Sequence, residues 1–293
     1  MKKMILLALS TMLFMLLTAT ERSSAATQLE ILLPLYAYPN HYEPEAYVWK
    51  RVVSAQAHVP ITAIINPNNG PDNAPPNRDY VKGLNDLRTA KVKLLGYVHT
   101  NYGTRSLDAI KTDIDWYAQY YNLNGIFLDE GASQAEYVDF YAKIYTYIKQ
   151  KTGLTQVVLN QGTHGDEGYL SRPAADTIVL FENYSAQWSQ YTPRSYVAEY
   201  PADRFAALIH STPDIETLQK TIDRARDRNV KYLYVTNRSP DIGSRNPWDN
   251  LPSYWRSELN YLHQLNQGQL NQSQTGNSPG IKTGNKAVSD VRS

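Results

Sequence analysis

The amino-acid sequence predicts an α/β protein that folds as a single (β/α)8 barrel, and three observations lead to this prediction. Between residues 29 and 265, short apolar runs alternate with amphipathic helical segments. The alternation contains eight apolar runs over about 240 residues, a typical length for a barrel of this type. The turn after the first run, residues 36–40, has no glycine, whereas a doubly wound sheet usually carries a glycine-rich turn there.

The predicted strands are rich in Val, Ile, Leu, Tyr or Phe, as expected for parallel strands covered on both faces. These apolar runs are shorter than a typical buried helix, so they favour strands. The eight runs occupy residues 29–36, 61–67, 93–99, 125–130, 156–161, 177–183, 204–210 and 231–237.

Helical patterns fill most of the gaps between these strands. Pro44 suits the first turn of one helix, and Ser106 is a typical N-cap of another. The fifth and sixth helices have weak patterns, and the only candidates are residues 165–173 and 191–200. The clear helices are predicted over residues 44–57, 78–90, 106–121, 136–151, 213–228 and 252–265.

The two ends of the chain have compositions unlike the barrel. Residues 1–26 combine Lys2 and Lys3 with an apolar stretch and a small-residue cleavage site, which is the pattern of a secretory signal peptide. An uncleaved anchor is the competing interpretation. We therefore expect a secreted or periplasmic protein whose domain spans residues 27–266. Residues 267–293 are polar and poor in large apolar side chains, so they are predicted to be a disordered tail.

Composition excludes several classes of chemistry. The chain has no cysteine, which rules out disulfides, thiolate metal sites and cysteine nucleophiles. The formal net charge is +1 and no dense basic run occurs, so no nucleic-acid partner is expected. We expect a monomer without a cofactor and without stable membrane insertion once the signal is removed.

The fourth predicted strand, residues 125–130, ends in two adjacent carboxylates, Asp129 and Glu130. A buried ionised carboxylate is costly, so this pair should lie where the strand leaves the core. In parallel α/β folds that edge is the face of the active site. The alternative interpretation is a helix N-cap, since Asp caps helices well.

Every other predicted strand also ends in a polar or aromatic residue. Polarity is expected wherever a strand leaves the core, but three carboxylates, two histidines and several amides without a lysine indicate a pocket. These strand ends are Tyr36, Asn66, His99, Asp129–Glu130, Asn160–Gln161, Glu182–Asn183, His210 and Asn237.

Known motifs narrow the chemistry. The histidines lack metal-ligand spacing, no GxSxG elbow is present, and no P-loop occurs. Carboxylates among aromatic and amide side chains suit glycoside hydrolysis, which needs one carboxylic acid and one carboxylate. Strands four and six lie roughly 9–10 Å apart, and inward-leaning side chains can close this distance to the glycosidase range. We therefore predict that Glu182 reacts together with Asp129 or Glu130.

Six ordered motifs carry a resemblance to a known family. They occupy residues 33–39, 65–71, 96–100, 125–130, 159–162 and 181–182. With them the chain resembles the spherulation-specific family 4 proteins, the spherulin-4-like glycoside hydrolases. The resemblance implies a (β/α)8 barrel and endo-acting hydrolysis of α-1,4-linked N-acetylgalactosamine in microbial exopolysaccharide. It also implies catalytic roles for Asp129, Glu130 and Glu182.

The polysaccharide is expected to bind along the strand ends and the loops just beyond them, without a metal ion. Two other functions stay open: a non-catalytic polysaccharide-binding barrel and a metal-dependent polysaccharide deacetylase. The predicted substrate-binding residues are Tyr36, Tyr38, Asn66, His99, Tyr102, Asn160, Trp188 and Asn237.

Overall fold

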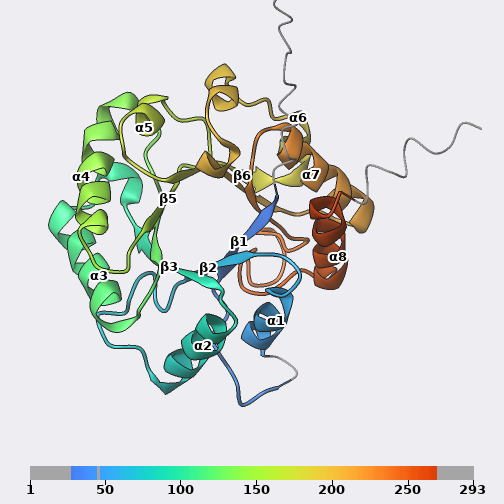
Figure 1. The fold of residues 1–293 in the computed structure, drawn as a ribbon, viewed down its shortest axis with the longest axis horizontal. Helices are drawn as coiled ribbons and strands as arrows, with labels where there is room; N and C mark the ends of the chain where they lie inside the picture. The colour runs from blue at the N-terminus through green and yellow to red at the C-terminus, as the bar shows by residue number, and fades with distance from the viewer. Residues whose placement is uncertain (1–27, 45–46, 269–293) are drawn as a thin grey trace, which may run out of the picture.

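The protein is a closed barrel of eight parallel strands that follow one another around the barrel in chain order. A computed structural model describes residues 28–44 and 47–268. Figure 1 shows the strands at the centre with the helices around them. The predicted single (β/α)8 barrel is thereby confirmed. The predicted signal segment and all but two residues of the predicted tail lie outside the described residues.

Each predicted strand is present, and its ends differ from the prediction by at most two residues. The barrel closes where Glu30 of the first strand pairs with Tyr232 of the last. Gly125 opens the fourth strand, and a Cβ there would lie 2.0 Å from the carbonyl oxygen of Gln156, so this close pairing requires glycine. The strands are β1 Glu30–Leu35, β2 Ile61–Ile65, β3 Lys93–His99, β4 Gly125–Asp129, β5 Gln156–Asn160, β6 Thr177–Tyr184, β7 Phe205–His210 and β8 Tyr232–Val235.

The six clear helices are also present. Side chains of Asn77, Ser106 and Asp214 cap three of them by accepting backbone N–H groups of the first turn. The α-helices are α1 Val48–Ala55, α2 Arg78–Thr89, α3 Leu107–Tyr120, α4 Val138–Lys149, α5 Gly168–Ser171, α6 Ser185–Gln190, α7 Ile215–Asp227 and α8 Trp255–Asn266. Short 3-10 helices are η1 Asn101–Gly103, η2 Ala135–Tyr137, η3 Ser195–Glu199 and η4 Ala202–Arg204.

The predicted position of the sixth helix is wrong. Helix α6 follows β6 directly, whereas residues 191–200 contain only the 3-10 helix η3. Pro193 disfavours a helical conformation at the preceding residue, so a helix could not run through this segment. Helix α6 has only six residues, which is too short for a visible amphipathic pattern.

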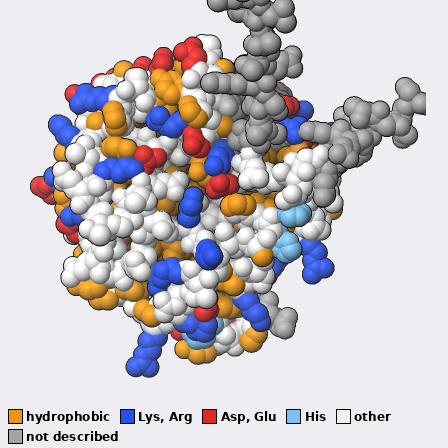
Figure 2. Space-filling view, viewed as in Figure 1, with side chains coloured by type: hydrophobic (Ala, Val, Ile, Leu, Met, Phe, Trp, Pro, Cys, Tyr) orange, Lys and Arg blue, Asp and Glu red, His pale blue; other side chains and the backbone are white. Residues whose placement is uncertain are grey.

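The surface carries charges of both signs. Figure 2 shows Lys and Arg side chains distributed over the visible face, with Asp and Glu side chains between many of them. This distribution fits the net charge of +1. In the described part of the chain, none of the helices combines the length and the apolar character that a membrane crossing requires.

One carboxyl group is buried where helix α8 packs against β8, outside the pocket lining. Glu258 of α8 has no exposed surface, and burial raises its pKa far above the usual value. Its charge would in turn oppose ionisation of the neighbouring Tyr234 and Tyr254 hydroxyls. The protonated form therefore fits this position, because a neutral carboxyl group is cheaper to bury than a charged one.

We predict that the stability of the Glu258→Gln variant, measured relative to wild type, is higher at pH 8 than at pH 4. A folded-state pKa above the unfolded value means that the folded protein binds this proton more tightly. The resulting stability is complete below the unfolded pKa of about 4.3 and is lost as the pH rises. Thermal melting of both proteins from pH 4 to pH 8 measures the difference, and a constant difference would contradict a buried neutral Glu258.

Candidate active site

Three neighbouring strands bring the predicted carboxylates together. Asp129 ends β4, Asn160 ends β5, and Glu182 lies near the end of β6. The Asn160 side-chain nitrogen lies 2.7 Å from Asp129 Oδ1 and 2.5 Å from Glu182 Oε2. An amide nitrogen carries two hydrogens, so Asn160 donates one hydrogen bond to each carboxylate.

This shared donor limits the separation of the two carboxylates. Contacts of 2.7 and 2.5 Å to one nitrogen mean that Asp129 Oδ1 and Glu182 Oε2 lie no more than 5.2 Å apart. Their strands are not neighbours, because β5 lies between β4 and β6. The two side chains therefore lean toward each other over the end of β5.

A bulge in β6 sets the direction of the Glu182 side chain. The pairing of β6 with β7 shifts register between Val179 and Phe181, which turns the following residues. Gly162 fills the gap on the β5 side: its N–H donates to the Val179 carbonyl at 3.0 Å, and its carbonyl accepts from the Glu182 N–H at 3.1 Å. A Cβ on Gly162 would lie 3.4 Å from the Glu182 Cβ, and its φ of 63° favours glycine.

Two tyrosines lie on the side of Asp129 toward β1 and β3: Tyr36 directly follows β1, and Tyr97 lies within β3. The Tyr97 hydroxyl donates to Asp129 Oδ2 at 2.7 Å, and the Tyr36 ring meets the Tyr97 ring edge-on at 5.8 Å. Burial, followed by the charge of Asp129, raises the pKa of both hydroxyls. Both hydroxyls therefore keep their protons, and Tyr97 donates its own to Asp129.

Glu182 holds its proton more tightly than an ordinary glutamate. Burial is the main cause, the negative charge of Asp129 adds to it, and together they raise the pKa of Glu182 to about 7. Hydrogen bonds from Asn160 and from the Trp248 indole act in the opposite direction, because they favour the charged form. Glu182 is therefore the group in this pair that carries a proton near neutral pH.

An open pocket surrounds this pair at the carboxyl ends of the strands. The loop after β8 supplies one wall, and its Trp248 ring meets the His210 ring edge-on at 5.9 Å. Burial lowers the pKa of His210, which favours a neutral imidazole in this wall. The pocket is lined by Tyr102, Asp129, Glu130, Asn160, Gln161, Gly162, Glu182, His210, Pro240, Pro247 and Trp248.

Glu130 occupies a strained backbone position beside the pair. Its φ is 52°, in the left-handed region that a residue other than glycine rarely adopts. The Tyr102 N–H donates to the Glu130 carbonyl at 2.7 Å, and Tyr102 itself has a φ of 52°. A hydrogen bond thus joins two residues of left-handed backbone conformation where the chain turns away from β4.

A buried hydrogen-bond chain fixes this turn. Thr100 Oγ1 lies 2.9 Å from the Asp129 carbonyl oxygen and 2.8 Å from that of Glu130. Carbonyl oxygens only accept, so the Thr100 hydroxyl donates to them. The Tyr141 hydroxyl, 2.8 Å from Thr100, must then donate to Thr100, while it accepts the Ala132 N–H at 2.9 Å. This order leaves a single arrangement of the protons.

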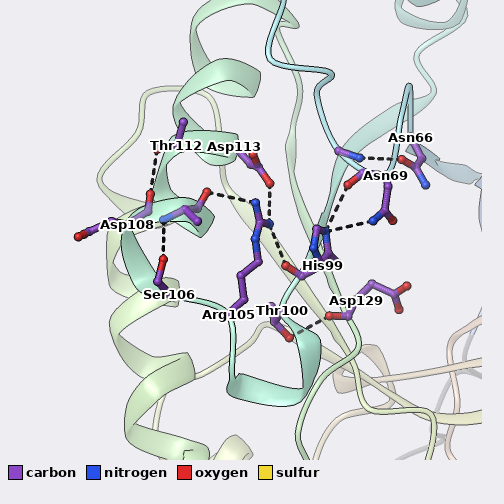
Figure 3. A network of polar contacts seen from close by, with 12 residues as sticks. Asn66, Asn69, His99, Thr100, Arg105, Ser106, Asp108, Thr112, Asp113 and Asp129 are labelled. Atoms are coloured by element: carbon purple, nitrogen blue, oxygen red, sulfur yellow. Dashed lines mark hydrogen bonds and ion pairs between the residues drawn. The ribbon is translucent and has the colours of Figure 1, made fainter.

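The ends of β2 and β3 form a second polar network, drawn in Figure 3. The Asn66 side chain accepts the Gly70 N–H at 2.9 Å and closes the loop after β2. His99 Nδ1 contacts the Asn69 carbonyl at 3.3 Å, and Arg105 connects the His99 carbonyl to Asp113. Asn66 and His99 thus hold two loops in position beside the pocket.

The structure brings some of the predicted site residues together and not others. All three predicted carboxylates, Tyr102 and Asn160 line the pocket, and Tyr36 lies behind Asp129. Other predicted residues make contacts elsewhere. The Tyr38 hydroxyl donates to Asp79 of α2 at 2.7 Å, and the Asn237 side chain accepts the Ser253 N–H at 3.0 Å.

The expectation that Trp188 binds sugar is wrong. This side chain has no exposed surface, and its indole N–H donates to the Thr221 carbonyl of α7 at 3.1 Å. It packs against Phe181 with ring centroids 4.9 Å apart. Trp188 belongs to the short helix α6, which turns it toward the packing layer, rather than to a surface loop.

Several residues that line the pocket or contact its carboxylates are not among the predicted substrate-binding residues. Gln161 and His210 are polar residues at predicted strand ends, so the sequence does indicate that they lie at the pocket face. Tyr97 lies within β3 and resembles an ordinary buried strand residue. Trp248 lies in the long connection between β8 and α8, and its position there depends on contacts that local sequence does not encode.

Over residues 28–44 and 47–268, no three or more His, Cys, Asp or Glu side chains are grouped so that they could hold a metal ion.

Residues 30–262 match the family model described as spherulation-specific family 4. The chain belongs to spherulation-specific family 4. Spherulin-4 of Physarum polycephalum is 33% identical over 278 residues, which cover 90% of this chain and 77% of that protein. The family resemblance of the sequence motifs is thus confirmed.

Two solved structures extend the comparison. The structure of Aspergillus clavatus Sph3 in complex with GalNAc has a TM-score of 0.68 and 25% identity, covering 82% of this chain and 99% of Sph3. An α-L-fucosidase from Paenibacillus thiaminolyticus has a TM-score of 0.50 and 9% identity, covering 84% of this chain and 50% of the fucosidase. This second likeness concerns the barrel fold alone.

We predict that Tyr141→Phe destabilises the protein by about 1–3 kcal/mol, because it leaves the buried Ala132 N–H without its acceptor. Tyr145→Phe on the same helix is the matched control. The Tyr145 hydroxyl donates to Asp176, which keeps its ion pair with Lys149 when that hydroxyl is lost. Urea unfolding of both variants measures the difference, and equal losses of stability would contradict the special position of Tyr141.

Proposed function

We propose that this member of spherulation-specific family 4 is a secreted glycoside hydrolase that cleaves α-1,4-linked N-acetylgalactosamine in exopolysaccharide. The observation that carries the proposal is the Asp129–Asn160–Glu182 arrangement, with one carboxylate held by donors and the other kept protonated near neutral pH. The likeness to Sph3, whose structure holds GalNAc, supports the choice of sugar. The predicted signal peptide supports a substrate outside the cell.

The environments of the two carboxylates support different roles. Asp129 accepts hydrogen bonds from Tyr97 and Asn160, and such donors favour a charged carboxylate. Glu182 retains its proton because burial and the charge of Asp129 raise its pKa to about 7. We assign Asp129 as the carboxylate that faces the anomeric carbon and Glu182 as the acid that protonates the leaving oxygen.

The separation of the two groups favours a double displacement. Retaining glycosidases place their carboxyl groups about 5–5.5 Å apart, whereas inverting enzymes leave about 6.5–9.5 Å for a water molecule. The oxygens of Asp129 and Glu182 that share Asn160 are within 5.2 Å of each other. In the proposed reaction Asp129 forms a covalent bond to the sugar, and water then releases it with Glu182 acting as base.

The anomeric configuration of the proposed substrate supports a protein nucleophile. In an α-linked N-acetylgalactosaminide, the 2-acetamido group and the leaving oxygen lie on the same side of the ring. The acetamido group cannot then attack from the opposite side. A carboxylate of the protein must supply the attacking oxygen, and Asp129 is the one we assign.

Asp129→Asn and Glu182→Gln should each lower turnover of the polysaccharide about 10²- to 10⁴-fold and leave thermal melting close to that of wild type. Each change keeps the shape of the side chain but removes the charge or the transferable proton. Glu130→Gln should also lower turnover, because Glu130 lines the same pocket. The measurement is product release from α-1,4-linked N-acetylgalactosamine polymer, followed by mass spectrometry.

The matched control is Glu136→Gln, an exposed glutamate of η2 outside the pocket, which should hydrolyse the polymer at the wild-type rate. Near-normal turnover in Glu182→Gln would overturn the assignment of Glu182 as the acid. Binding of the polymer without any product from wild type would favour the non-catalytic barrel. Acetate release that a chelator abolishes would favour the deacetylase.

We expect kcat/KM to fall as the pH rises through about 7, because Glu182 then loses the proton it must donate. Asn160→Ala should move this limb to higher pH. It removes a hydrogen bond that favours the charged form of Glu182, so the pKa of that carboxyl rises. A limb that stays in place or moves to lower pH in Asn160→Ala would contradict this coupling.

A further inference from the structure

Exposed tyrosines gather on the face of the barrel that carries the pocket. Among the described residues, four tyrosines are well exposed: Tyr38, Tyr42, Tyr102 and Tyr120. Three of the four lie in the loops that follow β1 and β3, at the carboxyl ends of the strands. Tyr102 lines the pocket, whereas Tyr38 and Tyr42 do not. These last two need a separate explanation.

The Tyr38 ring is exposed and yet held in a fixed orientation. Its hydroxyl donates to Asp79 Oδ2 at 2.7 Å and accepts from the Asn77 side chain at 3.2 Å. Its ring meets the buried Tyr80 ring edge-on at 5.6 Å, while half of the residue stays exposed. The polar atom therefore has its partners within the protein, and it is ring surface that remains for a ligand.

Tyr42 lies close to the same carboxylate. Asp79 raises the pKa of the Tyr42 hydroxyl by hydrogen bonding and then by its charge. The Tyr42 ring lies 4.1 Å from the His41 ring, and His41 Nδ1 lies 3.6 Å from the other oxygen of Asp79. Tyr42 is nevertheless 72% exposed. Asp79 at the start of α2 thus holds the Tyr38 hydroxyl and lies close to the exposed Tyr42.

The position of these rings connects them with the pocket. Tyr38 follows Tyr36 by two residues, a span of no more than about 7 Å along the chain. Tyr36 in turn packs edge-on against Tyr97, whose hydroxyl donates to Asp129 of the pocket. Tyr38 therefore lies on the same face of the barrel as the pocket, and a polymer longer than the pocket can extend toward it.

We propose that Tyr38, held by Asp79, and the neighbouring Tyr42 form an accessory carbohydrate-binding platform that holds the polysaccharide outside the catalytic pocket. Exposed aromatic faces in a fixed orientation stack on the C–H faces of sugar rings, with little ordering of the protein on binding. The platform rests on the proposed polysaccharide substrate. It adds a requirement of its own: the benefit must grow with chain length, because a short sugar that fills the pocket does not reach these rings.

The test compares affinity for a long α-1,4-linked N-acetylgalactosamine polymer with affinity for the disaccharide. Both are measured on Glu182→Gln protein, so that binding is observed without hydrolysis. Adding Tyr38→Ala and Tyr42→Ala should lower the ratio of polymer to disaccharide affinity about tenfold. Tyr42→Ala alone should lower it by a smaller factor, and its exposed position makes unfolding an unsuitable explanation.

Tyr120→Ala is the matched control, because Tyr120 is an exposed tyrosine stacked on Trp116 of α3 rather than placed in a loop after β1. An unchanged affinity ratio in the double variant, or an equal fall in Tyr120→Ala, would overturn the platform. A lowered ratio together with wild-type protein that releases no product would support the platform and contradict the proposed hydrolysis. Polymer that fails to bind at all would overturn both.

Discussion

The hydrogen bonds from one amide group, Asn160, to two carboxylates determine how the site is built. The two oxygens they join lie no more than 5.2 Å apart in a partly buried setting, where like charges repel more strongly than in water. Two ionised groups would be costly there, so the pair favours a state with one proton. Because burial raises the pKa of Glu182, this proton resides on Glu182. Two similar side chains thus acquire the different protonation states that acid/base chemistry requires.

The barrel supplies the positions that this pair needs. Parallel strands in chain order put the ends of β4, β5 and β6 side by side, and the bulge in β6 turns Glu182 toward Asp129. The left-handed backbone at Glu130 costs free energy, which the hydrogen-bond chain through Thr100 and Tyr141 offsets. The backbone strain at Glu130 is therefore stabilised by hydrogen-bonding side chains around the pocket.

The alternation of apolar runs was enough to predict the barrel, because strand burial and helix amphipathicity both leave periodic patterns. The strand ends predicted the carboxylates for a related reason: the carboxyl ends of parallel strands meet at one face. The sequence could not place Trp188, since a six-residue helix has too little pattern to show which side faces inward. Trp248 was missed because a long loop is positioned by contacts distant in sequence.

Glu182 and Glu258 show why a raised pKa does not identify a functional site by itself. Burial raises the pKa of both carboxyl groups. Glu258 has no exposed surface and lies on α8 against the end of β8, so no substrate reaches it. Glu182 lines an open pocket, faces a second carboxylate and shares a donor with it. The difference between a buried structural acid and a candidate catalytic acid lies in this access and in this partner.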